Sequence, residues 1–479
     1  MRETIATISR LARRNVVALL ALFVALSGSS YAAATKLMPK NSVGSAQVIN
    51  GSLQKIDFGK KTIAALKAAR GTQGLPGAAG PAGLAGPPGP KGDIGAAGAP
   101  GQPGAQGPQG PTGIAIDRSA PAAAAVATLD SAGNVGNSTA ATVGADGLGL
   151  ISYYDRTTGA LKVAHCNNTA CATAVKTTLD SVGNFSAAAL GTSVAIGTDG
   201  LALISYFDAT DGDLKVAHCT NIACTSAGTS LLDTGPQTDG YLSSATIGAD
   251  GLGLISYVSA TTGDLKVAHC DNTACTSAGL STLVNTGDAF GQTSVAIGTD
   301  GLGLISYSNS ITFDLKVAHC NNTACTSAGL SPLDSAGSVG FYNSTTIGAD
   351  GLGLIGYYDQ TNGHLKVAHC TDVACTSALL NTLDNGLAGS DTSATVGVDG
   401  LGLISYYGNN ALKVAHCNNT LCTGASLTEL DTGLNGGPNT SLTIGTDGLG
   451  LISYYNDTVG DLKVAHCSNA FCMPYFRRR

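Results

Sequence analysis

The segment Leu-Lys-Val-Ala-His-Cys occurs seven times in this chain of 479 residues, each time followed by four residues and a second cysteine. The copies begin at Leu161, Leu214, Leu265, Leu315, Leu365, Leu412 and Leu462. Their first cysteines are 53, 51, 50, 50, 47 and 50 residues apart. A period near 50 residues is typical of propellers and solenoids, in which every repeat is one small structural unit. The repeat therefore limits the fold to a ring or a stack of similar units.

Each unit contains four segments with the composition of β-strands. In the second copy they cover residues 192–196, 201–207, 214–219 and 225–233. The turns between the first three are Gly-Thr-Asp-Gly at 197–200 and Asp-Ala-Thr-Asp-Gly at 208–212, and both are hairpin signals. The unit is therefore predicted to be an up-and-down sheet of four strands, and seven such sheets form a β-propeller.

The ends of the chain decide between a ring and a solenoid. The fourth segment of the first six units ends in Leu-Asp or, in the third unit, in Leu283-Val284, but the chain stops before the seventh unit completes one. A spare Thr128-Leu129-Asp130 precedes the first unit, so an N-terminal strand can complete the last blade and remove the open sheet edges. A solenoid would need caps at both ends instead. We predict an all-β, seven-bladed propeller over residues 125–479 with strand-swapped closure.

The fourteen cysteines all belong to the seven Cys-x4-Cys pairs. A hairpin loop of four residues would place its flanking cysteines opposite each other, within reach of a disulfide. A histidine precedes each pair, but three ligands per unit fall short of the four in a structural zinc site, so we expect no metal. The predicted disulfides are Cys166–Cys171, Cys219–Cys224, Cys270–Cys275, Cys320–Cys325, Cys370–Cys375, Cys417–Cys422 and Cys467–Cys472.

A tyrosine in the second segment and the lysine and histidine of the repeated segment also recur in every unit. The tyrosines are Tyr153, Tyr206, Tyr257, Tyr307, Tyr357, Tyr406 and Tyr454. Because a single active site needs only one copy of each group, sevenfold repetition indicates structural parts. We expect the tyrosines to pack between blades with hydrogen-bonded hydroxyls, and the Asp that ends the fourth segment is a candidate partner for the lysine.

The N-terminus carries the pattern of an export signal. Arg2, Arg10, Arg13 and Arg14 precede the apolar run 16–26, and residues 30–32 suit a signal peptidase. Residues 1–32 are predicted to be a signal peptide; the alternative is an uncleaved anchor, since residues 16–34 are just long enough to span a bilayer. Both predict a secreted or cell-surface protein, in which disulfides persist, and a membrane contact only if the segment stays uncleaved.

Glycine occupies every third position from Gly71 to Gly113 without a break, and nine prolines fall in the same stretch. Only glycine fits at the axis where three polyproline-II chains meet, so this period predicts a collagen triple helix and a homotrimer through residues 71–113. The stretch resembles the stalks of bacterial collagen-like proteins. Residues 33–70 are predicted to be a neck that holds the trimer in register, and residues 114–124 a linker.

The charge is distributed unevenly along the chain. Residues 33–114 carry eight Lys or Arg and two Asp, whereas residues 115–479 carry thirteen Lys or Arg and twenty-nine acids. An acidic head lacks the basic stripe that nucleic acid requires, so we expect no nucleic-acid partner.

No catalytic constellation stands out, and we expect no cofactor. The unit resembles the blades of sialidase-type propellers, but the chain has no Trp and lacks the turn motif and the arginines that this resemblance would require. The head contains one Glu, Glu429, so a glycosidase carboxylate pair would have to consist of Asp residues. The sequence therefore favours a protein without enzymatic activity, and a carbohydrate-active enzyme remains an alternative.

The seven copies differ mainly in the loops that join one unit to the next and the two middle strands of a unit. Variable loops on a rigid ring are a common place for recognition, although drift at unconstrained tips would give the same variation. The candidate ligand-binding residues in these loops are Arg156, Phe185, Asp239, Tyr241, Phe290, Phe313, Phe341, Tyr342, His364 and Asp391. We interpret the chain as a trimeric, collagen-stalked surface or matrix protein whose propeller head binds an extracellular glycan or protein. A structural spacer without a ligand is the other alternative.

Overall fold

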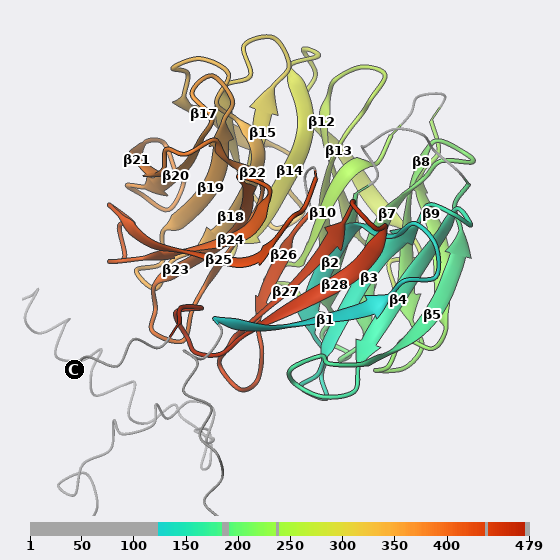
Figure 1. Cartoon of the computed structure of the whole chain (residues 1–479). Helices are drawn as coiled ribbons and strands as arrows, with labels where there is room; N and C mark the ends of the chain where they lie inside the picture. Colours follow the sequence, from blue (N-terminus) through green and yellow to red (C-terminus); the bar gives the residue numbers. More distant parts are fainter. Residues whose placement is uncertain (1–122, 184–190, 236–238, 436–438, 475–479) are drawn as a thin grey trace, which may run out of the picture. The chain divides into compact units, whose positions relative to one another are not determined.

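The computed structural model describes residues 123–183, 191–235, 239–435 and 439–474 (Figure 1). The predicted signal peptide, neck and collagen-like stalk, at 1–32, 33–70 and 71–113, lie outside these residues, as does the linker up to residue 122. No helix among the residues that the structure describes is long and apolar enough to cross a membrane.

Seven four-stranded antiparallel sheets make up the head, and we number them as blades in chain order. Blade 1 is β2 (Val135–Val143), β3 (Gly149–Asp155), β4 (Ala160–Cys166) and β5 (Ala174–Ser181). Blade 2 is β6 (Thr192–Ile196), β7 (Ala202–Asp208), β8 (Asp213–Cys219) and β9 (Ala227–Asp233). Blade 3 is β10 (Tyr241–Ile247), β11 (Gly253–Val258), β12 (Leu265–Cys270) and β13 (Ala278–Val284).

The next three blades repeat this order. Blade 4 is β14 (Ala289–Ile297), β15 (Gly303–Asn309), β16 (Leu315–Cys320) and β17 (Ala328–Asp334). Blade 5 is β18 (Phe341–Ile347), β19 (Gly353–Asp359), β20 (His364–Cys370) and β21 (Ala378–Asp384). Blade 6 is β22 (Ala388–Val396), β23 (Gly402–Gly408), β24 (Ala411–Cys417) and β25 (Ala425–Thr432).

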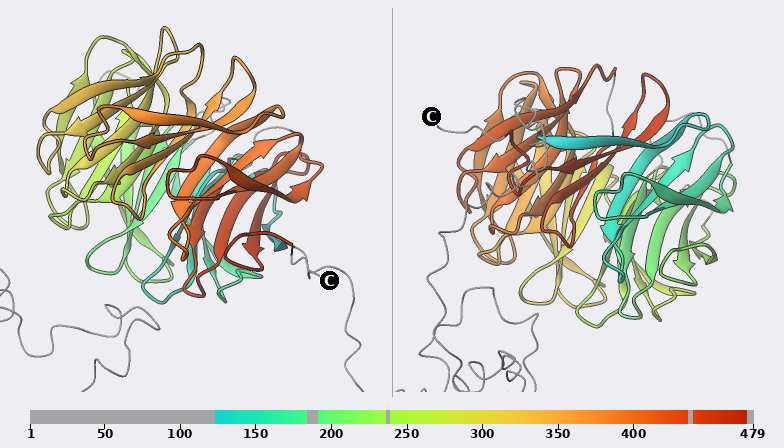
Figure 2. Two further views of the ribbon diagram at one scale, coloured as in Figure 1. Left: turned by 90° about the vertical axis from the view of Figure 1, so that its left-hand side faces the viewer. Right: turned by 60° about the horizontal axis from the view of Figure 1, so that its bottom comes forward.

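Blade 7 contains both ends of the head. It is formed by β26 (Ser441–Ile444), β27 (Gly450–Asn456) and β28 (Asp461–Cys467), with β1 (Ala124–Asp130) as its outermost strand. β1 is antiparallel to β28 and pairs Val126 with Ala465 (Figure 1, where cyan lies beside red; Figure 2, right). The predicted seven-bladed propeller with strand-swapped closure is confirmed, because the first strand supplies the edge that the last repeat lacks.

The first strand of every blade lies at the axis and contacts the first strands of the neighbouring blades. The second strands are buried on both faces, as in β3, because each lies between two blades. Small hydroxyl side chains join the inner strands: Ser441 Oγ accepts a hydrogen bond from the Ala141 amide at 2.9 Å, and Ser193 Oγ accepts one from Ala245 at 3.0 Å. Short side chains at these positions allow the strands to approach closely around the axis.

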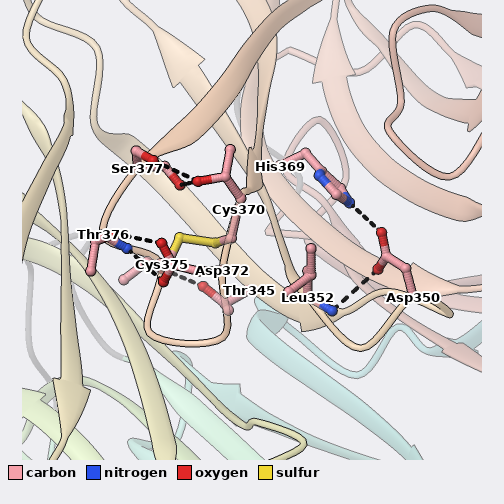
Figure 3. The surroundings of a disulfide bond; sticks show 11 residues. Thr345, Asp350, Leu352, His369, Cys370, Asp372, Cys375, Thr376 and Ser377 are labelled. Atoms are coloured by element: carbon pink, nitrogen blue, oxygen red, sulfur yellow. Dashed lines mark hydrogen bonds and ion pairs between the residues drawn. A yellow bond between two sulfur atoms is a disulfide. The ribbon is translucent and has the colours of Figure 1, made fainter. Parts of the chain in front are cut away.

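One end of the ring, the constant face, is formed by the Gly-x-Asp-Gly turns and the Cys-x4-Cys loops. All seven predicted disulfides are present, with Cα–Cα distances of 4.8–5.0 Å. The loop is longer than predicted, because Cys370 pairs in register with Ala378 and Cys375 lies inside the turn with a φ of 53° (Figure 3). The disulfide therefore braces a seven-residue turn instead of joining two facing strand residues.

A histidine–aspartate pair accompanies each disulfide on the constant face. In blade 5, His369 Nε2 lies 2.9 Å from Asp350 Oδ2, while Asp350 Oδ1 accepts the amide of Leu352 at 3.2 Å (Figure 3). The same pair occurs in all seven blades at 2.8–2.9 Å. The repeated histidine thus ties the third strand to the turn between the first two, which is a structural role.

The repeated lysine and tyrosine meet on the Asp that ends the outer strand of the preceding blade. Tyr153 Oη donates to Asp130 Oδ2 at 2.8 Å, and Lys162 Nζ donates to the same oxygen at 2.7 Å. Burial raises the pKa of Asp130, but the hydrogen bonds from Lys162 and Tyr153 more than offset it and lower the pKa to about 2. This lysine–aspartate–tyrosine triad connects neighbouring blades at six of the seven interfaces.

Candidate functional site

The opposite end of the ring, the variable face, has a pocket on the propeller axis. We call it the axial pocket; it has a volume of about 80 Å³. The first strands of six blades provide its lining, close to the points where the chain enters each strand. The lining residues are Ser138, Thr139, Gly191, Thr192, Leu242, Ser243, Gln292, Asp391, Thr392, Asn439 and Thr440.

An irregularity in the inner strands forms the rim of this pocket. The register of β22 with β23 shifts between Ser390 and Ser393, and similar shifts occur in β2, β10, β14 and β18. A residue at each shift adopts left-handed backbone angles, which side chains other than glycine rarely do. We call this place in the blade the ring position; it includes Ser138 (φ 51°), Leu242 (46°), Tyr342 (48°) and Asp391 (53°), and in blade 7 Asn439 (40°), which precedes β26.

A layer of hydroxyl groups lies directly below the ring position. The residue that follows it in the chain hydrogen-bonds to the repeated serine of a neighbouring blade, as in Thr192 with Ser152 at 2.8 Å and Ser243 with Ser205 at 2.8 Å. These contacts recur around the axis and are buried. The floor of the axial pocket is therefore nearly the same in every blade, while the rim differs from blade to blade.

Asp391 is the acidic residue of this rim. Its Oδ1 accepts a hydrogen bond from Asn439 Nδ2 at 3.0 Å, but its Oδ2 is buried without a partner among the described residues. The side chain is almost fully enclosed, and burial raises the pKa of Asp391 to about 6. A carboxylate that is buried with an unsatisfied oxygen costs stability, which is a common mark of a functional group.

Neighbouring polar groups connect Asp391 to the rest of the rim. Asn439 Oδ1 accepts hydrogen bonds from Asn137 Nδ2 at 3.2 Å and from the Ser138 amide at 3.3 Å. The charge of Asp391, together with burial, raises the pKa of Tyr342 to about 12. Thr392 Oγ1 donates to the carbonyl of Tyr342. Of the candidates from the sequence, Asp391 thus lines the axial pocket, and Tyr342 lies beside it.

Four other candidates are absent from the lining of the axial pocket. Asp239 is buried and pairs with Lys266 at 3.1 Å, which gives it a structural role. Phe313 and Phe341 stack on each other, with ring centroids 5.0 Å apart, and Tyr241 packs edge-on against Phe207 at 5.0 Å.

Two further candidates, Arg156 and His364, do not line the axial pocket. Arg156 lies in the turn between β3 and β4, and His364 is the first residue of β20. Phe185 is outside the described residues, and the side chain of Phe290 is likewise not described.

Asn439, Asn137, Ser138 and Gln292 belong to the rim but were not predicted. The sequence did contain a signal for them, because the ring position holds a different residue in most copies although the residue two positions after it is serine in six of the seven. A one-residue insertion in blade 4, where β14 is longer between Phe290 and Ser294, obscured the alignment.

The axial pocket is suited to holding a polar ligand by hydrogen bonds. Hydroxyl and amide groups can donate and accept, and Asp391 adds one strong acceptor. Asp391 is the one carboxylate among the described lining residues, whereas hydrolysis of a glycosidic bond generally requires two. No group of three or more His, Cys, Asp or Glu side chains lies close enough to hold a metal ion in the part of the chain that the structure describes.

In comparison with known protein families, residues 66–120 match the model of the collagen triple helix repeat, so the chain carries this repeat. No curated protein sequence matches the chain.

Solved structures of similar fold include a protein of unknown function from Dyadobacter fermentans, with 10% identity and a TM-score of 0.46 over 71% of this chain and 97% of that one. The Penicillium chrysogenum α-L-arabinanase complexed with arabinobiose has 13% identity and a TM-score of 0.44 over 58% and 92%. The polysaccharide lyase Uly1 has 10% identity and a TM-score of 0.44 over 70% and 89%. No functional conclusion follows from likeness at this level.

Proposed function

We propose that the protein is an exported, collagen-stalked homotrimer whose propeller heads bind an extracellular glycan through the variable face. The unbroken Gly-x-y segment and its match to the collagen repeat support the stalk in this proposal. Three chains joined in one triple helix carry three heads, and multivalent attachment raises affinity without new contacts.

The observation that carries the binding role is the contrast within the axial pocket. Its floor repeats from blade to blade, whereas its rim presents Ser138, Leu242, Asp391 and Asn439 from left-handed backbone positions. Tyr342 has the same backbone geometry and lies beside the pocket, near enough for the charge of Asp391 to raise its pKa. Evenly distributed drift would not be expected to leave a buried, unsatisfied carboxylate at the axis, because such a group destabilises the fold.

A glycan suits this rim better than an apolar ligand. Sugar hydroxyls both donate and accept hydrogen bonds, as the hydroxyl and amide groups of the rim do. At about 80 Å³ the axial pocket is smaller than the ~300 Å³ or more of a site for a complete drug-sized molecule. We therefore infer that it holds one projecting group of a larger ligand that lies across the variable face.

The test is glycan-array binding by the full-length protein, followed by calorimetry with the glycans that bind. Asp391→Asn and Tyr342→Ser should each weaken binding by about tenfold, since each removes a contact at the rim. Val398→Thr is the matched control, because Val398 is exposed on the constant face where Thr198 and Thr299 stand in other blades. Absence of any glycan binding, or equal binding by all four proteins, would favour the spacer alternative.

Hydrolysis of the same glycans is measured in parallel. Cleavage that Asp391→Asn abolishes would replace the binding role with the enzymatic alternative. Intact glycans after prolonged incubation support the binding role.

A further inference from the structure

The interface between blades 3 and 4 lacks the acid that the other six interfaces share. Val284 ends β13, whereas an Asp ends the corresponding segment before every other interface. At those six interfaces the Asp accepts a hydrogen bond from the lysine and, in each case, from the tyrosine of the following blade. The lysine Nζ lies 5.5–5.7 Å from the centre of the tyrosine ring in the same six places.

Tyr307 and Lys316 keep their places in blade 4 without this partner. Tyr307 is 1% exposed, and its hydroxyl makes no hydrogen bond to any residue that the structure describes. Lys316 makes no ion pair within the described chain and does not lie over the tyrosine ring as its six counterparts do. Burial, with a contribution from Asp288, raises the pKa of Tyr307 to about 12, so the hydroxyl remains a donor at neutral pH.

A pocket of about 510 Å³ opens at this interface, and we call it the blade 3–4 pocket. Val284, Tyr307 and Lys316 line it together with Asp288, Asp314 and Pro332. A valine side chain ends one bond earlier than an aspartate, so its methyl groups stop short of the place where carboxylate oxygens lie at the other interfaces. Two hydrogen-bond donors therefore face a space that elsewhere in the same molecule holds a carboxylate.

Two carboxylates in the lining, Asp288 and Asp314, bear on which ligand fits. A lysine at this position can lie beside more than one carboxylate, because Lys266 at the preceding interface binds Asp233 while Asp239 lies 3.1 Å from its Nζ. Asp288 and Asp314 also supply acceptors for hydroxyl or amide donors on the remainder of a ligand. The best match is a ligand that carries one carboxylate beside hydrogen-bond donors.

We propose that the blade 3–4 pocket is a binding site for a ligand carboxylate, which takes the position filled by aspartate at the other six interfaces and accepts hydrogen bonds from Lys316 and Tyr307. This site shares no residue with the axial pocket. A uronic acid and the carboxyl group of an amino acid or peptide share the chemistry that it recognises.

The experiment uses the full-length protein with three probes: acetate, D-galacturonate and N-acetylglycine. Binding is measured as the rise of the thermal unfolding midpoint with probe concentration, with sodium chloride at equal ionic strength as the reference. We expect acetate to raise the midpoint above the chloride reference, and whichever larger probe matches the pocket to do so at lower concentration.

Val284→Asp restores the residue of the other interfaces. This variant should have a higher midpoint without a probe and should no longer respond to any of them. Lys316→Met leaves the pocket open but removes the charged donor, and it should weaken binding by about tenfold or more. The reciprocal variant, Asp334→Val, empties the blade 4–5 interface and should add a second responsive site.

An equal response of the native protein and Val284→Asp to the probes would overturn the proposal, as would the absence of a response in both. If Val284→Asp does not fold, an unchanged affinity in Lys316→Met has the same consequence. A failure of glycan binding by the axial pocket would leave these outcomes unaffected, because Asp391 is not part of this pocket.

Discussion

The constant and variable faces of the ring are built from the same seven repeats, but they distribute their interactions differently. On the constant face the histidine–aspartate pairs and the disulfides lie within single blades, as in His369 with Asp350 and Cys370 with Cys375, while threonines such as Thr198 donate to a carbonyl of the next blade. On the variable face the partners come from different blades, as Asn439 does for Asp391 and Asn137. A pair inside a blade has the same surroundings in every copy, whereas Asn439 at the axis meets groups of two other blades that differ from copy to copy.

Seven interfaces between blades offer a second comparison within the molecule. Six contain a lysine–aspartate–tyrosine triad, and the one between blades 3 and 4 has lost its acid while keeping the lysine and the tyrosine. Retention of two donors without their acceptor shows that the interface tolerates the loss. The following predictions test both comparisons, from the largest expected effect to the smallest.

Low pH should destabilise the interfaces between blades, because it protonates the aspartates of the triads, while the disulfides stay intact. The pKa of Asp130 is about 2 in the folded protein, below the ordinary value of 3.8, and the pKa values of Asp180, Asp334 and Asp384 are also lowered. A lowered pKa contributes stability above pH 4 that is lost as the pH falls toward 2, by about 2 kcal/mol for Asp130 alone.

The measurement for this prediction is thermal unfolding followed by circular dichroism at pH 5 and pH 2.5. The midpoint should drop steeply between the two. A midpoint that stays constant would show that the triads contribute little to the stability of the ring.

Removal of one triad acid should be the costliest single substitution. Asp334→Val leaves the Lys366 ammonium and the Tyr357 hydroxyl without their acceptor and should destabilise the head by about 4 kcal/mol. The free energy of unfolding in urea is measured for this variant and for the double variant that combines Asp334→Val with Lys366→Met. Recovery of stability in the double variant is expected, because the uncompensated charge is then absent.

Asp391 should make the variable face less stable as the pH rises. Its pKa of about 6 in the folded protein lies above the unfolded value of 3.8, so stability falls between pH 4 and pH 6 by about 3 kcal/mol. Asp391→Asn should therefore be more stable than the native protein at pH 8 and equal to it near pH 4. Urea unfolding at the two pH values decides this, and a pH-independent difference would contradict the role of ionisation.

Loss of one disulfide should have the smallest effect of the four. Serine at both Cys320 and Cys325 opens a short loop on the constant face, and the chain-entropy relation gives a cost of about 2 kcal/mol. Glycan affinity should stay unchanged, because the loop lies at the opposite end of the ring from Asp391. A parallel loss of affinity would show that the two faces are coupled.

Much of the scaffold could be predicted from short segments of the sequence. The period of the Leu-Lys-Val-Ala-His-Cys segment determined the number of blades, and the spare Thr128-Leu129-Asp130 determined how the ring closes. Tyrosine hydroxyls and lysines were expected to be paired, and six interfaces confirm it, whereas Val284 makes the seventh different. The prediction of a four-residue hairpin loop with two facing cysteines was wrong, because Cys375 lies within a longer turn.

The candidate site could be predicted only in part from the sequence. Tyr342 and Asp391 were included among the variable-loop residues, but nothing in the chain order indicates that they lie together with Asn439 and Asn137, which is 302 residues from Asn439. Residues such as Asp239 and Tyr241 had the same sequence character and turned out to pack within the interfaces.

The sequence by itself thus determined the repeat unit, its closure and its cross-links, because local spacing and strand alternation set these within about fifty residues. The tertiary structure decided which of the variable residues face the axis, which depends on register shifts in the inner strands and on closure of the ring. It also decided that the lost acid at Val284 leaves an open pocket beside Lys316 and Tyr307, since that depends on how two blades pack.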